Sequence, residues 1–428
     1  MAGRGTIRAW LVGLGAIIMT LSTMGPFILT SLYINAMTVD LGVTVGQISI
    51  ALSIRTVSSM VAAFTIGKIV KALNHRIIIL GAAVCVFAVQ FTISVSTSII
   101  PIYLIVCLNG FGTVWGGMAM GQIAIAQWFA KGRGMMMSAC MVALSLMLTV
   151  CFPIVSAQIE TYGYRPVVMV IGIIASIGVA ISAFLVSGSP EKHGVLPLGA
   201  DKGTVEDVAS VTVPSLSWKS IYRGSVFWAI IVIVVLGDMV FQGYSSQSAV
   251  IYGTLGLDEM SAAFAMSLFT FLCIPSQFIF GFLCDRTGPK WALGICGGVS
   301  TVVLLCAFLL VGWTGAVILA CGLAFSAGLT TLYGPNAALR IFGPREAGEI
   351  VGMMSVASSA GATIGPLVFG FTYDGFGSYS VALTIMGIAL AVCLYLNFWV
   401  HSKKNREMIQ QQIAFEDSLQ ASGDSAAM

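Results

Sequence analysis

The sequence contains little charge for its length. Asp, Glu, Lys and Arg make up 9% of the 428 residues, whereas about 25% is usual for a soluble globular protein. Hydrophobic residues make up 58% of the chain, and the mean hydropathy is +0.98. This composition excludes an ordinary soluble domain and predicts a protein that crosses a membrane several times.

The chain also lacks the residue patterns of metal sites and of known intramembrane enzymes. The three histidines, His75, His193 and His401, are far apart, and the ten cysteines show neither metal-ligand nor disulfide spacing. There is no His-Glu-x-x-His motif and no pair of membrane aspartates. We therefore expect no metal, no cofactor and no enzymatic activity. The net charge of +3 follows from the loops and predicts no nucleic-acid partner.

The uncharged stretches predict twelve membrane-spanning helices. A bilayer core of about 30 Å needs roughly 20 helical residues for each crossing. On that basis we expect spans within 9–39, around Arg55, twice within 77–130, within 134–159, within 166–190, around Asp238, within 260–284, twice within 291–339, within 350–373 and within 375–400.

The spans divide into two sets of six that resemble a repeat. Gly67 and Gly281 begin similar basic loops 214 residues apart, and the same offset relates Gly163 to Gly377. Parallel repeats of this kind occur in transporters. We expect an N-terminal six-helix bundle at 1–188, a central cytosolic loop at 189–223, a C-terminal six-helix bundle at 224–401 and a cytosolic tail at 402–428.

Eighteen of the twenty Lys and Arg residues lie in alternate connecting segments. Because basic residues in short loops stay in the cytosol, this pattern predicts a multi-pass protein of the plasma membrane with both termini cytosolic. The two exceptions are Arg165, which we expect in a loop at the outer surface, and Arg55, which interrupts an uncharged stretch inside the membrane.

A loop after the eighth span resembles a motif of the major facilitator superfamily. The motif reads Gly-x-x-x-Asp-Arg-x-Gly-x-Lys, and the matching residues here are Gly281, Asp285, Arg286, Gly288 and Lys290. Three further regions, 127–134, 189–199 and 361–379, resemble the monocarboxylate transporters and the oxalate/formate antiporters. The resemblance implies an all-α fold of twelve transmembrane helices in two pseudo-symmetric bundles, and transport by alternating access.

The motif loop is the predicted gate on the cytosolic side. We expect the Asp285 carboxylate to pair with Arg345 or with a basic residue of the same half, since such a pair can stabilise one of two states. The simpler interpretation is that these charges only flank a hydrophobic span.

The anion site of the two related branches is missing. Both place an Arg in the eighth helix, where this chain has Gln277, and one adds an acid where it has Cys273. The Lys residues that the branches use in the first or the eleventh helix are absent as well. The charged groups left inside the membrane are Arg55 and Asp238. An Arg at such a depth costs roughly 2.5 to 3.5 kcal/mol on insertion scales, so it is a functional candidate.

Three interpretations of Arg55 remain open. It binds an anionic substrate, it pairs with Asp238 as an outer gate or proton-coupled switch, or it extends to the outer headgroups without a specific role. Asp238 carries a coupled proton or is a polar residue of the cavity mouth. Five further polar and aromatic residues either line a substrate site or only join neighbouring helices. They are Tyr33, Gln242, Gln277, Tyr333 and Asn336.

The sequence as a whole predicts a secondary transporter that moves a small organic anion, most simply a monocarboxylate, by proton symport or by exchange for a counter-anion. We expect it to act as a monomer in the lipid bilayer. One alternative is a neutral or amphipathic substrate, either exported or imported. Another is a membrane sensor with the same fold that transports nothing.

Overall fold

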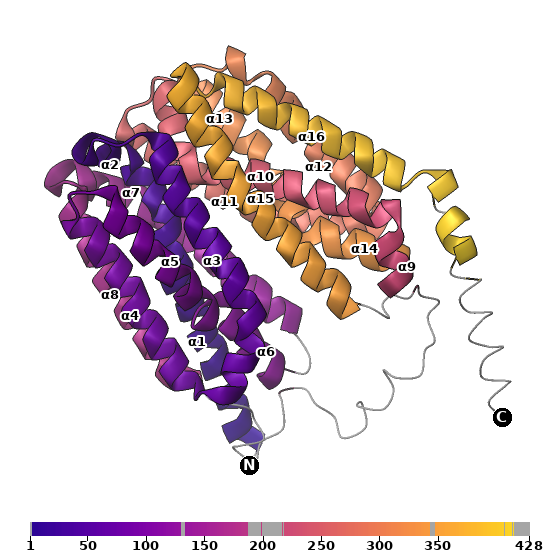
Figure 1. The fold of residues 1–428 in the computed structure, drawn as a ribbon, viewed down its shortest axis with the longest axis horizontal. Coiled ribbons are helices and arrows are strands. Elements are labelled where there is room, and N and C mark those ends of the chain that lie inside the picture. The colour runs from indigo at the N-terminus through magenta and orange to yellow at the C-terminus, as the bar shows by residue number, and fades with distance from the viewer. Residues whose placement is uncertain are drawn as a thin grey trace. The chain divides into compact units, whose positions relative to one another are not determined.

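A computed structural model describes residues 2–129, 133–186, 198, 216, 218–342, 347–405, 407–412 and 414. These residues are almost entirely helical, as Figure 1 shows, and their one β feature is an isolated bridge between Phe129 and Leu198. A helix satisfies its backbone hydrogen bonds internally, which hydrocarbon requires of any segment that crosses it. The expected all-α membrane fold is therefore confirmed.

The first six expected spans correspond to eight α-helices and one short 3₁₀-helix. They are α1 (Ala2–Leu29), η1 (Thr30–Tyr33) and α2 (Ile34–Leu41) in the first span, then α3 (Val45–Ala72), α4 (His75–Val95), α5 (Ile99–Trp115) with α6 (Met118–Trp128), α7 (Arg133–Tyr162) and α8 (Tyr164–Leu185).

The later spans follow the short helix α9 (Trp218–Arg223). They are α10 (Ser225–Thr254), α11 (Glu259–Thr287), α12 (Pro289–Leu305) followed by η3 (Ala307–Leu309), α13 (Gly312–Ala324) with η4 (Leu329–Tyr333) and α14 (Gly334–Phe342), α15 (Ala347–Phe376) and α16 (Ser380–Val400). Ten helical spans of the described chain are long and apolar enough to cross a membrane. The ninth and tenth expected spans begin with the shorter apolar helices α12 and α13, of 17 and 13 residues.

The chain forms two compact units. Unit 1 comprises 1–207, 245–271 and 369–377, and unit 2 comprises 208–244, 272–368 and 378–428. Unit 1 thus contains the first six spans together with the end of α10, the beginning of α11 and the end of α15.

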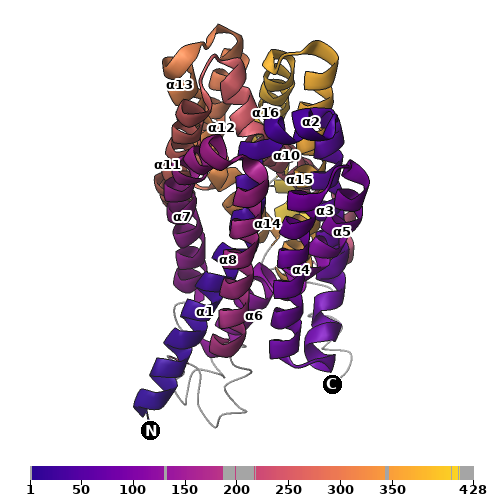
Figure 2. The same cartoon turned by 90° about the vertical axis from the view of Figure 1, so that its left-hand side faces the viewer.

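Within unit 1, α4 packs along α8 and α3 packs along α5 (Figures 1 and 2). The fourth span is interrupted at Gly116 and Gly117, between α5 and α6. A Cβ atom at Gly116 would overlap Ala82 of α4. The glycines of this span therefore both bring α5 close to α4 and mark a break in the helix.

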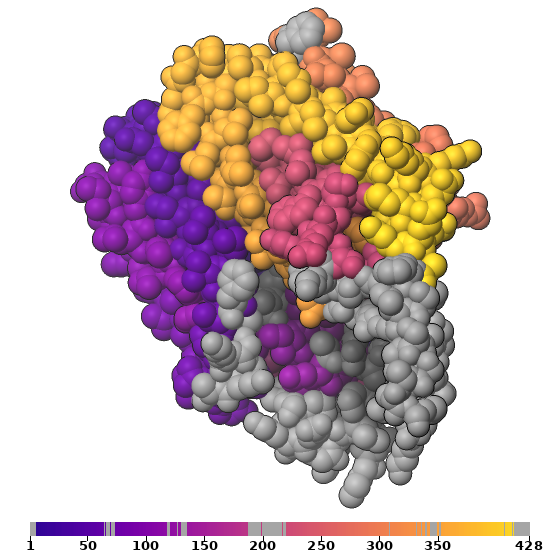
Figure 3. Space-filling view, turned by 45° about the vertical axis from the view of Figure 1, so that its right-hand side comes forward, coloured from indigo at the N-terminus to yellow at the C-terminus, as the bar shows by residue number. Residues whose placement is uncertain are grey.

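Within unit 2, the first part of α10 lies against α15. The space-filling view in Figure 3 shows the red surface of α10 beside the orange surface of α15. A Cβ at Gly361 would lie 2.9 Å from the Cβ of Asp238, so the two helices are nearly in backbone contact there. Asp238 is consequently buried, with an exposure of 4%.

Arg165 lies in the first turn of α8 rather than in a loop. Its Nε and Nη2 atoms donate to the Asp40 carboxylate of α2 at 2.9 and 2.6 Å, and the Tyr164 hydroxyl donates to the same oxygen. Its guanidinium also donates to the backbone carbonyls of Ser94 and Ser96, at 3.3 and 2.9 Å. One partly exposed Arg thereby joins three parts of unit 1.

We expect Arg165→Ala to lower the free energy of unfolding by about 1 kcal/mol. Hydrogen bonds to charged groups are worth about 1.5–3 kcal/mol, but partial exposure of this ion pair reduces its contribution. The thermal-unfolding midpoint of the purified protein in detergent measures the effect. Arg76→Ala is the matched control, because Arg76 is exposed. Equal midpoints for the two variants would show that the Arg165 cluster adds no stability.

Candidate functional site

The guanidinium of Arg55 is held by two neighbouring helices inside unit 1. Its Nε atom donates a hydrogen bond to Oδ1 of Asn109 on α5 at 3.0 Å. Its Cζ atom lies 3.6 Å from the ring centroid of Phe27 on α1, a cation–π contact. The side chain is 7% exposed and is therefore packed between helices rather than extended along the surface.

A glycine allows α5 to approach Arg55 this closely. A Cβ on Gly110 would lie 2.5 Å from the Arg55 carbonyl oxygen and from the Ser58 side chain. The Ser59 hydroxyl donates to the Gly110 carbonyl at 3.2 Å. Because Gly110 packs against α3, the preceding residue, Asn109, lies within hydrogen-bonding distance of Arg55.

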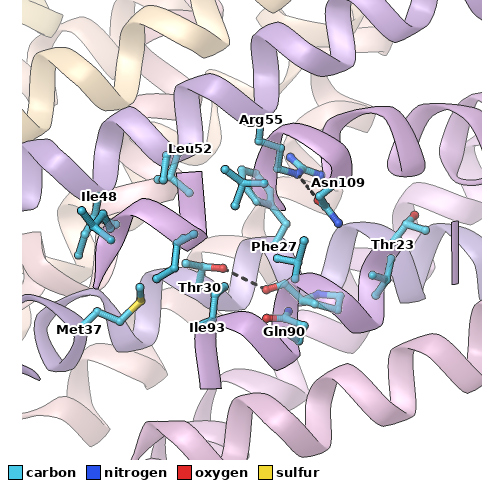
Figure 4. Close-up of a pocket in the computed structure, with 17 residues that line it drawn as sticks. Thr23, Phe27, Thr30, Met37, Ile48, Leu52, Arg55, Gln90, Ile93 and Asn109 are labelled. Atoms are coloured by element: carbon cyan, nitrogen blue, oxygen red, sulfur yellow. Dashed lines mark hydrogen bonds between the residues drawn. The ribbon is translucent and has the colours of Figure 1, made fainter. Parts of the chain in front are cut away.

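Arg55 and Asn109 line a cavity between α1, α2, α3, α4 and α5 (Figure 4). The volume open to the centres of water-sized molecules is about 50 Å³, and one water needs about 10–15 Å³ on this measure. The cavity thus has room for a few waters or for part of a small ligand. Twelve of its seventeen lining side chains are apolar, and the five polar ones are Thr23, Thr30, Arg55, Gln90 and Asn109.

Two polar groups on the cavity wall have unused hydrogen-bonding capacity. The Nη atoms of Arg55 form no hydrogen bond with any residue that the structure describes. Gln90 of α4 is 5% exposed, and its Oε1 atom is without a hydrogen-bond partner in the same part of the chain. Burying such groups unpaired is costly. The cavity can therefore bind a group that accepts from Arg55 and donates to Gln90.

Asp238 is the other buried ionisable residue expected from the sequence, and it belongs to unit 2. One of its carboxylate oxygens has no hydrogen-bond partner among the described residues. Gly361 of α15 packs directly against its Cβ. Asp238 is thus a buried carboxylate at a helix crossing, with one oxygen available to a proton or a ligand.

The aromatic candidates are occupied by internal contacts. Tyr33 is 1% exposed, and its hydroxyl is 3.1 Å from that of Thr30. Tyr333 is fully buried and donates to Oδ1 of Asn397 at 3.0 Å. Asn397 in turn donates to the Lys290 carbonyl at 2.8 Å. The Tyr33 contact lies within η1, whereas the Tyr333 contact joins η4 to α16. Neither tyrosine is among the residues that line the Arg55 cavity.

The amide candidates have different degrees of exposure. Asn336 is exposed and donates to the Leu332 carbonyl at 2.7 Å within its own span. Gln242 and Gln277 are partly exposed and lie in unit 2. The structure does not place these three side chains in the cavity around Arg55.

The motif loop has a local geometry that explains its glycine. Gly288 has φ +86°, a left-handed conformation that favours glycine, and it is the N-cap of α12, with Pro289 in the first turn. The Asp285 carboxylate lies 3.9 Å from Arg340 of α14. Arg340 is thus the basic partner from the same half, while Arg345 lies outside the described residues.

The other motif residues pack locally. Arg286 lies over the Phe282 ring at 4.7 Å, and Lys290 lies 5.4 Å from the Phe398 ring. Gly281 faces Leu332, with 4.0 Å to a Cβ built on it. The gating role of the loop stays a prediction.

Sequence reasoning missed both amides of the cavity. Asn109 and Gln90 were not among the expected site residues, although each is an isolated amide in a long uncharged stretch. That isolation is the signal that could have identified them. Which amide faces Arg55 depends on helix packing and cannot be read from spacing.

A family model described as Major Facilitator Superfamily matches residues 15–334 and 248–416. The chain belongs to the major facilitator superfamily. The resemblance found in the motif loop is thereby confirmed, and this superfamily member is a multi-pass membrane transporter.

Curated relatives of this major facilitator match only parts of it. Monocarboxylate transporter 10 of Mus musculus is 34% identical over 115 residues, which are 26% of this chain and 22% of the relative. The uncharacterized transporter YycB of Bacillus subtilis (strain 168) is 26% identical over 195 residues, 44% of this chain and 46% of the relative. The chain therefore matches about a fifth to a half of the length of these relatives.

The fold agrees with a solved transporter structure. The crystal structure of a mutant of the nucleoside transporter NupG matches with a TM-score of 0.68, covering 91% of this chain and 100% of that chain. The sequences are 12% identical, so the likeness concerns the fold alone.

We expect Tyr333→Phe to lower the free energy of unfolding by about 1–3 kcal/mol, because it leaves the buried Oδ1 of Asn397 without its donor. The transport KM should stay unchanged, since the hydroxyl contacts another helix rather than the cavity. Unfolding in detergent and uptake kinetics measure the two effects. Tyr395→Phe, at a side chain that is 70% exposed, is the control. A raised KM with unchanged stability would instead place Tyr333 at the substrate.

Proposed function

We propose that this transporter moves a small organic anion, a carboxylate of the monocarboxylate kind, by alternating access. The observation that carries the proposal is the buried Arg55, whose Nη atoms adjoin a cavity and have no hydrogen-bond partner in the described chain. The partial match to monocarboxylate transporter 10 also favours this substrate class.

The chemistry of the cavity supports an anion. A guanidinium presents parallel N–H groups that match a carboxylate in a bidentate arrangement. Asn109 fixes Nε and leaves the Nη atoms for a ligand, while Phe27 covers one face of the guanidinium. A substrate carboxylate would offset the cost of the buried charge. A donor group on the same substrate would satisfy Oε1 of Gln90.

A neutral or amphipathic substrate is the second candidate. It is favoured by the twelve apolar side chains of the cavity and by Gln277, which stands where the related branches place an Arg. In that case Arg55 contributes to helix packing through Asn109 and Phe27, or pairs with Asp238 during the transport cycle.

The proposal includes the orientation and the coupling of the transporter. The distribution of basic residues supports cytosolic termini and a plasma-membrane location. Asp238 is the candidate carrier of a coupled proton, because one of its carboxylate oxygens has no hydrogen-bond partner among the described residues. Exchange against a counter-anion is the alternative mode, and a monomer is the expected functional state.

Uptake into proteoliposomes tests the role of Arg55. We expect Arg55→Ala to lower carboxylate uptake at low concentration by tenfold or more, because charged hydrogen bonds are worth about 1.5–3 kcal/mol. Arg55→Lys should retain part of the activity, since it keeps the charge and loses the bond to Asn109. Arg76→Ala is the control for a general loss of positive charge.

A thermal-shift screen of carboxylates against their neutral analogues, at two pH values, separates the two substrate classes. Carboxylates should stabilise the parent protein and not Arg55→Ala. Unchanged uptake in both Arg55 variants, or stabilisation by neutral compounds alone, would refute the anion proposal. Ligand-induced stabilisation without uptake would point instead to a sensor.

Asp238→Asn tests proton coupling. We expect this variant to lose uptake driven by a pH gradient and to retain exchange at equal pH on both sides, because the amide cannot carry the proton. Asp258→Asn is the control. Hydrogen bonds from Ser261 hold the pKa of Asp258 below its ordinary value, so this carboxylate stays ionised near neutral pH. Gradient-driven uptake in Asp238→Asn equal to that of the parent would exclude Asp238 as the proton carrier.

A further inference from the structure

The first turns of α3 are bonded to two segments that are distant in sequence and belong to the same compact unit. The Asp374 carboxylate, near the end of α15, accepts a hydrogen bond from the backbone N–H of Gly46 at 2.9 Å. The amide nitrogen of Gln247, near the end of α10, donates to the Ser49 hydroxyl at 2.9 Å. Gln247 and Ser49 are fully buried. Two helices from the second half of the sequence, α10 and α15, thus form hydrogen bonds with the first turns of α3, a helix from the first half.

The Asp374 bond completes the capping of α3. The Thr44 hydroxyl accepts from the N–H of Gln47 at 3.2 Å and leaves the N–H of Gly46 free of an intrahelical partner. Asp374 accepts from that N–H. A carboxylate beside a helix N-terminus is stabilised both by the hydrogen bond and by the helix dipole.

Two glycines make this approach possible. A Cβ on Gly46 would overlap the Asp374 carboxylate, and a Cβ on Gly370 would overlap the Ser49 hydroxyl. The Cβ position of Gly370 lies 3.0 Å from the Cα of Gly46, so α15 and α3 meet nearly backbone to backbone. Small residues on both helices form this crossing.

The sequence repeat supplies an internal comparison. The offset of 214 residues relates Gly46 to Met260 and Asp374 to Glu160, so the equivalent crossing is that of α7 with α11. Glu160 is exposed and forms no hydrogen bond with the described residues. At the start of α11, Asp258 accepts from the N–H of Ser261 at 3.3 Å, which is the counterpart of the Thr44 cap on Gln47 in α3.

Neutral groups join the α7–α11 crossing. The Thr149 and Thr270 hydroxyls lie 3.2 Å apart, and the Ser156 hydroxyl donates to the Glu259 carbonyl at 3.3 Å. The two related crossings therefore differ among the described residues. The α3–α15 crossing has a carboxylate bonded to a helix N-terminus, whereas the bonds of Thr149 and Ser156 at the α7–α11 crossing come from neutral side chains.

We propose that Asp374 is a gating residue of the transport cycle, whose contact with the N-terminus of α3 holds this end of the protein closed and is broken when it opens. The charge pattern predicts that this end faces away from the cytosol, and alternating access requires it to open in the opposite state. A contact of one carboxylate with a helix terminus shifts such an equilibrium only about two- to fivefold. The bond therefore favours the closed state and still allows opening.

Thiol labelling from outside the cell tests this role without any substrate, so its result does not depend on the role of Arg55. Ser53 is 6% exposed and lies one helical turn beyond Ser49, on the same face of α3. In a Ser53→Cys background, a membrane-impermeant maleimide is added to intact cells. The initial labelling rate of the peptide that carries this cysteine is then measured by mass spectrometry.

We expect Asp374→Asn to raise this labelling rate about two- to fivefold, because the neutral amide loses the charge interaction with the helix. Gly46→Ala should raise the rate as well, since its methyl group displaces the carboxylate. Asp374→Glu keeps the carboxylate and should therefore be labelled at the same rate as the parent. Glu160→Gln is the matched control from the related crossing and should have no effect.

Gel filtration and the unfolding midpoint identify any variant that fails to fold. If Asp374→Asn does not fold, the labelling rate of Gly46→Ala tests the proposal. An unchanged labelling rate in the folded variants would overturn the proposal. An equal increase in Glu160→Gln would overturn it as well, because it would indicate a general effect of removing outer carboxylates.

Discussion

The membrane requires every polar group within it to find a partner, and this requirement organises the whole chain. The helices satisfy their own backbone hydrogen bonds. Many hydroxyl side chains do the same locally, as Thr20 and Thr23 do by donating to carbonyls four residues earlier. Polar groups that remain unpaired after this local pairing stand out. Among the residues that the structure describes, these are the Nη atoms of Arg55 and Oε1 of Gln90 in unit 1 and a carboxylate oxygen of Asp238 in unit 2.

Glycines determine where such polar groups meet neighbouring helices. Gly110 brings α5 against Arg55, and Gly361 brings α15 against Asp238. Gly46 and Gly370 do the same at the crossing of α3 with α15. In each case a missing Cβ allows near contact of two backbones and places a charged side chain at the crossing. The three proposed sites, for binding, coupling and gating, therefore share one structural feature, a glycine at a helix crossing.

The sequence predicted the spans and the family from features that act over short range. Runs of apolar residues are long enough to cross a bilayer whatever their neighbours are, and the Gly288 turn needs its glycine for local reasons. The candidate site was anticipated less completely. Arg55 was recognised by its charge, whereas Asn109 and Gln90 were overlooked and Tyr333 proved to be bonded to Asn397. An isolated amide or tyrosine has the same appearance in sequence whether it joins helices or lines a cavity.

The sequence by itself determined that this protein is a helical membrane transporter of the major facilitator superfamily, because hydrophobic length and the Asp285 loop do not depend on distant contacts. Only the tertiary structure decided that Arg55 meets Asn109 and Phe27, that Asp285 lies near Arg340 and that Asp374 caps α3. The physical reason is that partners of buried or capping groups come from other helices. Their choice depends on which helix faces pack together and how closely glycine lets them approach.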